Sequence, residues 1–595
     1  MKALGVFKHH LPLLLLVLLN LGAATFVSLD LARRLRPLGP AHGGSAPTTV
    51  PTRLPDSVAS PAPAIPATPV TPTRTPRPLS PGVRLADERF SYEDAWYAPQ
   101  VQAFLEAHGS ALATLSVPVG KGKDAFAHAL TAHCLRYGVH PKVVLALLEL
   151  QSGLVTGPSG DEALRWAFGL REEEWAGLER QLQWATYFLA EGFKGAGRNE
   201  TPRLTDGTLA PIPEGANAAT RALLRLLAYT ADGPRFAVLA SEGPGSFVAT
   251  YRALFGEDPR LPPAMEEGGP PAPFLSLPLA QEAPISACFD HEAPIFQKNG
   301  SVLLYTGAYT QQPSDGHDGW DYAAPGGTPV LASAPGRVVW AGWVDTLCPT
   351  PAGLVVLDHG HGYRTLYWHL QTIEAVEGQE LGRGERLGTV GNTGCSSGPH
   401  LHLTVQHLGR DTDPFGWCGS EQVPDDPWAL DPAGTSSHWL WADRPPPCGA
   451  SADGLVRVDD GDAAFGRSRA LWYEAPVGEG GRAFWTVAVG REEERVHQAV
   501  WRPELPAAGR YFLYASIPWY DTGRPDTTAA RYYIRHAGGE TRVVVDQAHA
   551  AGMWAFLGAF SFEAGTAGYV YLDEWTPDPG TTVWFDALVW VPEGK

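Results

Sequence analysis

Five residues in the middle of the chain carry side chains that could hold and use a metal ion. They are His317 and Asp321 in HDGWD, His369 in YWHL, and His400 with His402 in HLH. The HLH histidines are two apart, so on a β-strand their side chains point to the same face, and the four-residue spacing of His317 and Asp321 keeps them on one face of a strand or helical turn. Imidazole nitrogen and carboxylate oxygen both suit zinc. The set predicts a catalytic zinc site with three ligands and two spare imidazoles.

Short histidine motifs also arise by chance. The chain contains 19 histidines, so one HxH or HxxxD string alone is weak support for a metal site. A second HxH, formed by His359 and His361 in LDHGHGY, is flanked by glycines and indicates a turn. The five residues must therefore be judged with the sequence that surrounds them.

The surrounding sequence carries a family resemblance. The segments HDGWDYAAPGGTPVLASAPGRVVWAG, GLVVLDHGHGYRTLYWHL and GQELGRGERLGTVGNTGCSSGPHLHLTV follow one another in this order. From about Asp315 to Gln406 they resemble the lysostaphin/LytM-type zinc metallopeptidases without a missing element. The resemblance implies an antiparallel all-β peptidase domain, which we expect at residues 270–440, with zinc as the cofactor.

The resemblance also implies a role for each of the five residues. His317, Asp321 and His402 are the expected zinc ligands, and His369 and His400 are the expected catalytic histidines. Zinc lowers the pKa of a water molecule and polarises the scissile carbonyl. One free imidazole can then take the proton of the water, and the other can donate to the oxyanion or the leaving amine. Either histidine can take either role.

Short strands joined by turns must position these residues. Thr328, Val330 and Ala332 in TPVLA alternate like one face of a core strand, and Tyr363 and Tyr367 are expected to pack, with substrate hydrogen bonding as the alternative. A set of glycines is expected to serve turns that need a positive φ. These are Gly326, Gly327, Gly336, Gly342, Gly391, Gly394 and Gly398.

Length and composition favour a modular, exported protein. A chain of 595 residues is expected to form about three or four domains, and a hydrophobic content of 44% is enough for several cores. The net charge of −19 argues against nucleic acid as a partner, because a phosphate binder needs a basic stripe.

Residues 1–32 are predicted to be a signal peptide or a membrane anchor. Lys2 and Lys8 precede the apolar run LPLLLLVLLNL, and the small residues at 22–24 offer a cleavage site. The apolar character continues beyond them, as it would in an uncleaved anchor. The protein is therefore expected outside the cytoplasm, either secreted or anchored at the cell envelope.

Two further segments precede the peptidase-like region. Residues 37–88, rich in Pro, Thr and Ala, predict a disordered linker. Residues 90–260 have helical periodicity, and HPKVVLALLELQSGLVTG with GANAATRALLRLL resembles lysozyme-like glycan-cleaving domains. The usual glutamate before Ser-Gly is replaced by Gln151, and Glu149 is expected on a different helix face. An amide cannot act as a general acid, so we expect a non-catalytic scaffold, with an unrelated helical bundle as the alternative.

Residues 450–595 have an all-β pattern. Alternating runs such as RYFLYASI and ARYYIRH are separated by turn residues. VDDGDAAF, GMWAFLGAFSFEAG and VWFDALVWV resemble the golvesin/xanthan-lyase carbohydrate-binding-like β-sandwich, which implies a binding role. Asp459, Asp460 and Asp462 are interpreted as a turn, with a calcium site as the alternative.

Six cysteines are compatible with disulfides in an oxidising compartment. They are Cys134, Cys288, Cys348, Cys395, Cys418 and Cys448. We expect Cys348 to pair with Cys395, where a bridge would brace the site, and Cys418 to pair with Cys448.

The predicted fold class is multidomain: a helical lysozyme-like domain, an antiparallel all-β LytM-type peptidase domain and a C-terminal β-sandwich. The predicted function is zinc-dependent endopeptidase action on peptide bonds of bacterial cell-wall peptidoglycan, with flanking domains that bind wall or polysaccharide. The substrate class follows from the resemblance alone, whereas a zinc hydrolase also follows from the site residues. The alternatives are a non-catalytic wall-binding or regulatory protein that uses the peptidase fold for recognition, and a general secreted protease. The five intact site residues argue against the non-catalytic reading.

Overall fold

The computed structural model describes most of the chain from residue 82 onward. The described ranges are 82–91, 96–195, 200–263, 273–281, 283–292, 300–310, 314–346, 348–420, 422–431, 433–442, 455–548 and 550–593. The described residues all belong to one compact unit. The predicted signal peptide or anchor lies outside the described residues. Among the helices that are described, none combines the length and the apolar character that a membrane crossing requires.

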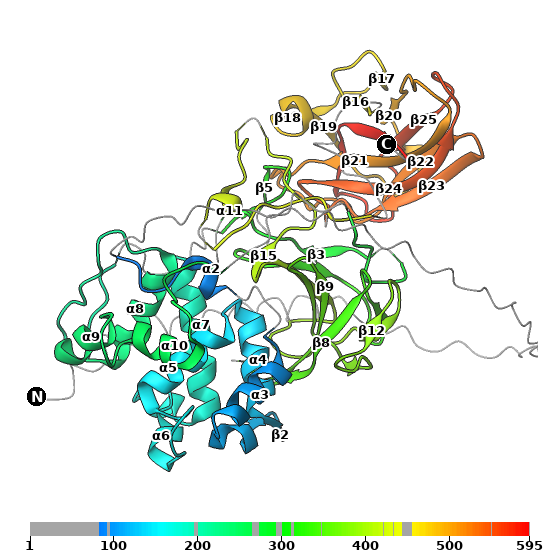
Figure 1. The fold of residues 1–595 in the computed structure, drawn as a ribbon. Coiled ribbons are helices and arrows are strands. Elements are labelled where there is room, and N and C mark those ends of the chain that lie inside the picture. The colour runs from blue at the N-terminus through cyan, green and yellow to red at the C-terminus, as the bar shows by residue number, and fades with distance from the viewer. Residues whose placement is uncertain are drawn as a thin grey trace, which may run out of the picture. The chain divides into compact units, whose positions relative to one another are not determined.

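The first described region is helical (Figure 1, blue to green). Its helices are α2 (Asp87–Phe90), α3 (Ala98–Ala107), α4 (Phe126–Tyr137), α5 (Pro141–Ser152), α6 (Asp161–Arg165), α7 (Leu178–Phe193), α8 (Ala218–Thr230), α9 (Gly233–Leu239) and α10 (Phe247–Phe255), with a hairpin of β1 (Ser116–Val119) and β2 (Gly122–Ala125). Local sequence explains their ends. The α5 helix has Pro141 in its first turn and stops at Gly153, whose φ is 69°. The side chain of Asn217 caps α8 by accepting from Thr220 N. Upstream of α2, Leu85 is fully buried, so the folded region begins within the segment predicted as a linker.

The end of α5 shows what replaces the missing acid. The Glu149 carboxylate accepts hydrogen bonds from the backbone N–H groups of Val155 and Thr156, at 2.9 and 3.0 Å. Gln151 donates to Thr230 Oγ1 at 2.9 Å and accepts from Arg235 at 2.8 Å. Both side chains therefore hold the turn and the neighbouring helices together.

The second region is built on antiparallel sheets (Figure 1, green to yellow). The main sheet has the order β12-β8-β9-β10-β14-β6-β3, with β15 beside β14, and a smaller sheet has the order β11-β13-β7. The strands are β3 (Ile285–Ala287), β4 (Val302–Leu303), β5 (Tyr309–Thr310), β6 (Trp320–Tyr322), β7 (Pro329–Leu331), β8 (Gly336–Val344), β9 (Ala352–Gly360), β10 (Tyr363–Trp368), β11 (Thr372–Ile373), β12 (Glu380–Leu381), β13 (Arg386–Thr389), β14 (Leu401–His407) and β15 (Arg410–Thr412), followed by helix α11 (Pro427–Leu430).

Cross-strand register separates the two faces of the main sheet. His402 on β14 lies directly opposite Asp321 on β6 and Trp368 on β10, so these three side chains share one face. Their neighbours Leu403, Trp320 and Tyr367 point to the other face and join the core of this region. The candidate site therefore lies on one face and the core of the region on the other.

The helical region packs on the same face as the candidate site. Eight side chains of the main sheet belong to the core of the helical region, namely Val339, Trp340, Val344, Ala352, Leu354, Val356, Leu366 and Trp368. Cross-strand pairs place several of them on the face of Trp368, because Trp340 lies opposite Val356 and Val356 lies opposite Leu366. The helices and the sheet thus share one continuous hydrophobic core beside the site.

A histidine bridges the edge of this shared core. His128 of α4 stacks on Trp340 at 4.6 Å between ring centroids. Its ring nitrogens lie 2.5 Å from Asp124 of the helical region and 2.7 Å from Glu377 of the sheet region. Burial by itself would lower the pKa of His128, but these two carboxylates outweigh it and raise the pKa to about 9. The imidazolium therefore links two acidic groups across the interface.

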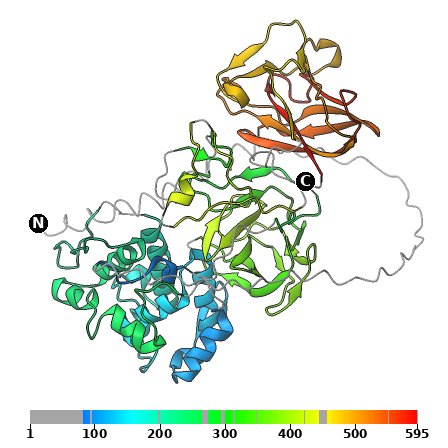
Figure 2. The same cartoon turned by 45° about the horizontal axis from the view of Figure 1, so that its top comes forward.

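The C-terminal region is a sandwich-like assembly of antiparallel sheets (Figure 2, orange to red). Its sheets have the orders β16-β27-β21-β24, β17-β20-β25-β22-β23 and β18-β19-β26, around a core that contains Trp501, Trp584 and Trp590. The strands are β16 (Val456–Val458), β17 (Phe465–Arg467), β18 (Tyr473–Ala475), β19 (Ala483–Val487), β20 (Gln498–Trp501), β21 (Gly509–Ile517), β22 (Ala530–His536), β23 (Gly539–Val545), β24 (Met553–Phe562), β25 (Tyr569–Asp573), β26 (Thr582–Phe585) and β27 (Leu588–Pro592).

The acidic residues that open this region form a turn. Asp462 accepts from the backbone N–H of Asp459, Asp459 accepts from that of Asp460, and Asp460 pairs with Arg482 at 2.8 Å. Local hydrogen bonds and one ion pair thus account for this cluster.

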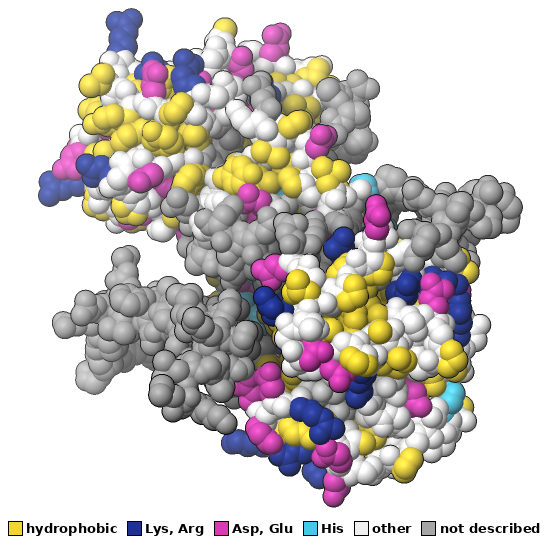
Figure 3. All heavy atoms as spheres, turned by 90° about the vertical axis from the view of Figure 1, so that its left-hand side faces the viewer, with side chains coloured by type: hydrophobic (Ala, Val, Ile, Leu, Met, Phe, Trp, Pro, Cys, Tyr) yellow, Lys and Arg dark blue, Asp and Glu magenta, His cyan; other side chains and the backbone are white. Residues whose placement is uncertain are grey.

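The surface drawn in Figure 3 carries mixed charge. Basic and acidic side chains are interspersed on the face shown, and the basic ones form no continuous stripe there. This distribution agrees with the net charge of −19. That face offers no basic track for a phosphate backbone.

The predicted bridge between Cys348 and Cys395 is confirmed. Cys418 is disulfide-bonded, and its predicted partner Cys448 lies outside the described residues. Cys134 and Cys288 are buried thiols, so the six cysteines are not all bridged.

A buried histidine holds two carboxylates inside the second region. His291 has no exposed surface, and its ring nitrogens donate to Asp413 at 2.9 Å and Asp426 at 2.8 Å. Burial by itself would lower the pKa of His291, but the two carboxylates outweigh it and raise the pKa to about 9. The charged imidazolium compensates negative charge that would otherwise be buried alone.

This arrangement predicts pH-dependent stability. The folded pKa of about 9 lies above the ordinary value of 6.5, so the stabilisation by His291 is complete below the ordinary value and is lost as pH rises through the folded value. Chemical denaturation of the native protein and His291→Gln should show a difference in unfolding free energy that shrinks by about 3 kcal/mol across this range. Titrating groups other than Asp413 and Asp426, which contact the substituted ring, affect both proteins alike. An unchanged difference would contradict the buried imidazolium.

The shared core makes a second prediction about stability. Leu354 of β9 is fully buried in the core that joins helices and sheet, so Leu354→Ala should lower the free energy of unfolding by about 2–5 kcal/mol. The matched control is Leu430→Ala, because the side chain of Leu430 is 77% exposed. Equal midpoints of guanidinium denaturation for the two variants would contradict a shared core.

Candidate metal centre

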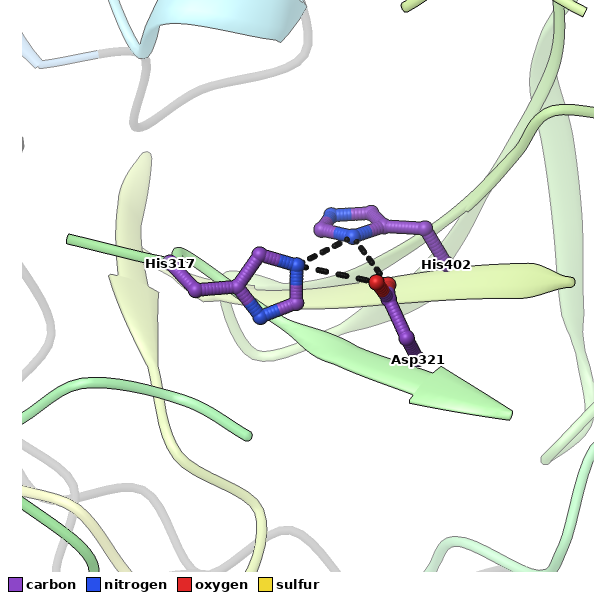
Figure 4. Close-up of side chains that lie close together, drawn as sticks. All are labelled: His317, Asp321 and His402. Atoms are coloured by element: carbon purple, nitrogen blue, oxygen red, sulfur yellow. Dashed lines mark hydrogen bonds and ion pairs between the residues drawn. The ribbon is translucent and has the colours of Figure 1, made fainter. Parts of the chain in front are cut away.

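Three side chains predicted as metal ligands converge on one point (Figure 4). His402 Nδ1 lies 2.8 Å from Asp321 Oδ1 and 3.0 Å from His317 Nε2, and His317 Nε2 lies 3.3 Å from Asp321 Oδ1. Around a tetrahedral zinc ion with bonds of about 2.0–2.2 Å, ligand atoms lie roughly 3.3–3.5 Å apart. The three ligand atoms therefore need to move apart only slightly to surround the ion. Among the described residues, this is the one group of three such side chains close enough to hold a metal.

The outer ring nitrogens of the two histidines have partners that orient their lone pairs. His317 Nδ1 lies 3.1 Å from the backbone carbonyl of Cys288, which requires a proton on Nδ1, so Nε2 is the nitrogen that bears the lone pair when the ring is neutral. His402 Nε2 lies 2.8 Å from Thr404 Oγ1, which can accept its proton and leave Nδ1 unprotonated. Each ring thus directs a lone pair at the point of convergence.

A glycine allows the chain to pass close to His402. His317 precedes β6, and Gly319 lies between it and the strand. A Cβ at Gly319 would lie 2.8 Å from His402 Nε2 and 2.6 Å from the carbonyl oxygen of Leu403. Only glycine therefore lets this loop bring His317 against the β14 histidine.

The three side chains form an electrostatic site for a cation. Burial by itself would raise the pKa of Asp321, but the neighbouring His317 and His402 outweigh it and hold the pKa well below its ordinary value. Burial by itself would lower the pKa of His317, but the charge and hydrogen bond of Asp321 outweigh it and raise the pKa to about 9. The ionised carboxylate attracts positive charge, and a metal ion must compete with a proton on His317.

The two remaining histidines lie beside this cluster with fixed orientations. His369 Nδ1 lies 2.7 Å from the carbonyl oxygen of Thr393, and His400 Nδ1 lies 2.8 Å from that of Gly398. Each Nδ1 therefore carries a proton, and the lone pair of each neutral ring is on Nε2, which in His400 lies 3.5 Å from Asp321 Oδ2. The distance between ring centroids is 4.6 Å for His369 and His400 and 5.9 Å for His369 and His402.

His369 is held in an uncommon backbone conformation and is kept neutral. Its φ is 62°, in the left-handed region that non-glycine residues seldom adopt. Burial, followed by the charges of His402 and His400, lowers the pKa of His369 to about 3. The imidazole is therefore uncharged over the whole physiological range and can receive a proton.

All five histidine and aspartate side chains line one pocket of about 320 Å³. Its walls also include residues that the sequence pattern did not single out. Arg136 of α4 reaches the wall from the helical region and lies over the Trp368 ring at 5.8 Å. Asp318 lies 3.6 Å from His402 Nε2, and burial would raise its pKa, but Lys194, His402 and His317 lower it.

Sequence spacing could have found only part of this surrounding set. Thr404 follows His402 by two residues on a strand, so alternation places it on the same face. Arg136 and Lys194 come from helices far away in the sequence, where no pattern links them to the site.

The other candidates of the sequence lie apart from the cluster. His359 lies on β9 and bonds to the Pro335 carbonyl and to Thr365, so the turn predicted for this HxH string is found only at His361, which is exposed with a φ of 51°. Tyr363 and Tyr367 are buried and pack in the sheet core. The expectation that both tyrosines pack is confirmed.

Three family models match different parts of the chain. "Peptidase family M23" matches residues 315–414, "LasA, N-terminal domain" matches residues 83–266, and "Golvesin C-terminal domain" matches residues 459–591. The first and third agree with the resemblances seen in the sequence. The second model matches the helical region, which the sequence predicted to be lysozyme-like, and it describes this region as the N-terminal domain of LasA.

Three curated relatives illustrate how far the similarity extends. Peptidoglycan DD-endopeptidase ShyA of Vibrio cholerae is 44% identical over 94 residues, covering 16% of this chain and 21% of the relative. DD-carboxypeptidase/endopeptidase Mpg of Neisseria meningitidis is 43% identical over 98 residues, covering 16% and 22%. Protease LasA of Pseudomonas aeruginosa is 26% identical over 341 residues, covering 55% and 74%. The matched segment is therefore about a fifth of the first two relatives.

The geometry predicts how a ligand substitution changes metal binding. Removing one converging nitrogen in His402→Ala should weaken zinc binding by more than about 100-fold, since even residues that only support a ligand contribute 10–100-fold. Isothermal titration with zinc measures this directly. The matched control is His361→Ala, because His361 is exposed and lies in the other HxH string. Equal zinc affinity of the two variants would exclude the cluster as the metal site.

Proposed function

We propose that this chain, which carries a Peptidase family M23 domain between a LasA N-terminal domain and a Golvesin C-terminal domain, is a zinc-dependent endopeptidase of bacterial cell-wall peptidoglycan. The observation that carries the proposal is the convergence of three ligand atoms beside two oriented imidazoles in one pocket. In this proposal His317, Asp321 and His402 hold zinc, and His369 and His400 are the catalytic residues.

The donor set fits zinc chemistry. Two imidazole nitrogens and one carboxylate oxygen are ligands that zinc accepts, and three protein ligands leave a position open. When bound, zinc supplies Lewis-acid chemistry: it polarises a carbonyl oxygen and makes water more acidic. The second nitrogens of His317 and His402 are held by Cys288 and Thr404, so the ligand rings keep their orientation.

The two imidazoles supply the proton transfers. Because the Nδ1 proton of each ring is donated to a backbone carbonyl, His369 and His400 both present the Nε2 lone pair to the pocket. A neutral ring with this orientation accepts a proton from the attacking water. Once protonated, the same nitrogen donates that proton to the departing amine. Either imidazole can perform both transfers.

The substrate class is the part of the proposal that rests on similarity. The names of ShyA and Mpg describe enzymes that act on peptidoglycan or on peptide ends, and their similarity covers the segment with the site. The Cys348–Cys395 bridge supports an oxidising compartment outside the cytoplasm, because disulfides persist there. We therefore place the enzyme at the cell envelope, either secreted or anchored.

The C-terminal region supports a further role in holding the enzyme on its substrate. Its match to the Golvesin C-terminal domain agrees with a binding module for wall or polysaccharide. Tyr473 stacks on Trp485 at 4.3 Å and remains 49% exposed, which provides an aromatic surface beside the edge of the sandwich. Aromatic rings with one wet side are common at binding surfaces.

Cell-wall digestion tests the proposal. Zinc-loaded protein should release new amines from purified peptidoglycan, detected by mass spectrometry of the products. His369→Ala and His400→Ala should keep the zinc and lose about 10²–10⁴-fold in kcat, the contribution typical of a general acid or base. His361→Ala is the control that should keep full activity, because its exposed ring lies outside the pocket.

The same digestion separates the proposal from its alternatives. If native, zinc-loaded protein releases no amines from any wall type but sediments with the wall, the non-catalytic binding protein is the better account. If it cuts casein as readily as peptidoglycan, a general secreted protease is the better account.

A further inference from the structure

Both proposed catalytic imidazoles depend on the same short segment, residues 393–398. The carbonyl oxygen of Thr393 accepts from His369 Nδ1 at 2.7 Å, and the carbonyl oxygen of Gly398 accepts from His400 Nδ1 at 2.8 Å. The Ser396 hydroxyl, between them, bonds to the Gly398 carbonyl at 2.9 Å. One segment therefore sets the proton position and the direction of both rings.

Regular secondary structure does not hold this segment. It lies between the ends of an isolated bridge, Gly391 to His400, and contains no helix or strand. Its placement must come from side-chain and covalent contacts. The ring of His369 needs such support because its backbone has a φ of 62°, which persists only where the surroundings enforce it.

The Cys348–Cys395 disulfide lies at the middle of the segment. It joins the segment to the loop between β8 and β9, with 5.3 Å between the two Cα atoms. The backbone N–H of Gly394 also donates to Thr350 Oγ1 of that loop at 3.2 Å. A Cβ at Gly394 would lie 2.6 Å from the Ala352 Cβ, so this segment and the start of β9 are in close contact.

We propose that the Cys348–Cys395 disulfide is a positioning element that aligns His369 and His400 through the carbonyls of Thr393 and Gly398. The inference rests on the proposed function and adds a redox requirement to it. When the bridge is opened, the segment loses its covalent link to the loop. The Thr393 side chain keeps its hydrogen bonds to Gly353 N and to the Leu370 carbonyl, both at 3.0 Å, so the Gly398 carbonyl and His400 are expected to move more than the Thr393 carbonyl and His369. The metal cluster is spared, because Asp321 and His402 lie on β6 and β14 and His317 is held by the carbonyl of Cys288.

The role differs from simple structural support in what it changes. A bridge that only stabilises the fold would lower the unfolding midpoint and leave kcat unchanged below that temperature. A bridge that aligns the imidazoles changes kcat below that temperature while the zinc content stays constant, because the metal ligands remain in place. Misplacing a catalytic group by about 1 Å costs on the order of 100-fold in rate.

The test compares the native protein with the Cys348→Ser/Cys395→Ser double variant, both loaded with zinc. We expect one zinc per chain in both, and a kcat on peptidoglycan fragments that is about 10–100-fold lower in the variant. Nitrogen-15 spectra of the imidazole rings should show the Nδ1–H tautomer of His369 and His400 in the native protein and its loss or exchange in the variant.

A second variant keeps the test informative if the double variant does not fold. Thr350→Val removes the acceptor of Gly394 N–H from an exposed position and leaves the disulfide intact. It should lower kcat in the same direction, by less, at full zinc content. Full kcat in a folded double variant, or full kcat in Thr350→Val where the double variant does not fold, would overturn the positioning role.

Reduction of the native protein provides an independent arm. Dithiothreitol transfers two electrons to the bridge, yielding two thiols and cyclic oxidised dithiothreitol, and removal of the reductant with reoxidation should restore kcat. Cys395 lines the pocket, so a freed thiolate could bind zinc itself, a complication that the serine variant excludes. If the oxidised native protein releases no amines, the proposed function fails. If the oxidised native protein releases amines, and the reduced protein and the serine variant have the same kcat as the oxidised protein, only the positioning role fails.

Discussion

The register between β6, β14 and β10 is the constraint on which the site depends. It sets Asp321, His402 and Trp368 side by side on one face of the sheet, while Trp320, Leu403 and Tyr367 fill the core beneath. A slip of one residue in β14 would turn His402 into the core and bring Leu403 to the pocket. Burial of the apolar set on the opposite face therefore holds the polar set in place, since the register that is best for the core is also the one that assembles the cluster.

The helical region uses the same face. Apolar side chains on this face are buried against the helices, among them Trp340, Val356, Leu366 and Trp368. The core that they form continues from the sheet into the helical bundle. The pocket is the part of this face that remains open, and Arg136 of the helical region forms part of its wall. The helical and peptidase-like parts are thus coupled through burial, and the surroundings of the site include residues from both. The half-buried C-terminal end of α5, where Glu149 and Gln151 are occupied by hydrogen bonds, agrees with a structural contribution of this region.

Sequence reasoning found the parts of the site that depend on residue type and spacing. Residue type and spacing gave the candidates in HLH and HxxxD, because a strand with alternating faces translates spacing into direction, and the resemblance to the LytM-type peptidases then implied which three of them are ligands. The Cys348–Cys395 bridge was also predicted, since both cysteines flank the site in sequence. The fold class followed from strand alternation and helical periodicity in separate stretches. The carbonyls of Thr393 and Gly398 could not be found, because a backbone oxygen carries no residue identity. Arg136 could not be found either, since only the packing of a distant helix on the sheet brings it to the pocket.

The central claim is that His317, Asp321 and His402 bind zinc on the face opposite the sheet core. The most direct measurement is an anomalous difference map at the zinc edge from crystals of the zinc-loaded protein. The account predicts one strong peak at about 2.0–2.2 Å from His317 Nε2, His402 Nδ1 and an Asp321 carboxylate oxygen, with His369 and His400 outside bonding distance. A peak bound by His369 and His400 instead, or no peak at the three-residue cluster, would contradict it.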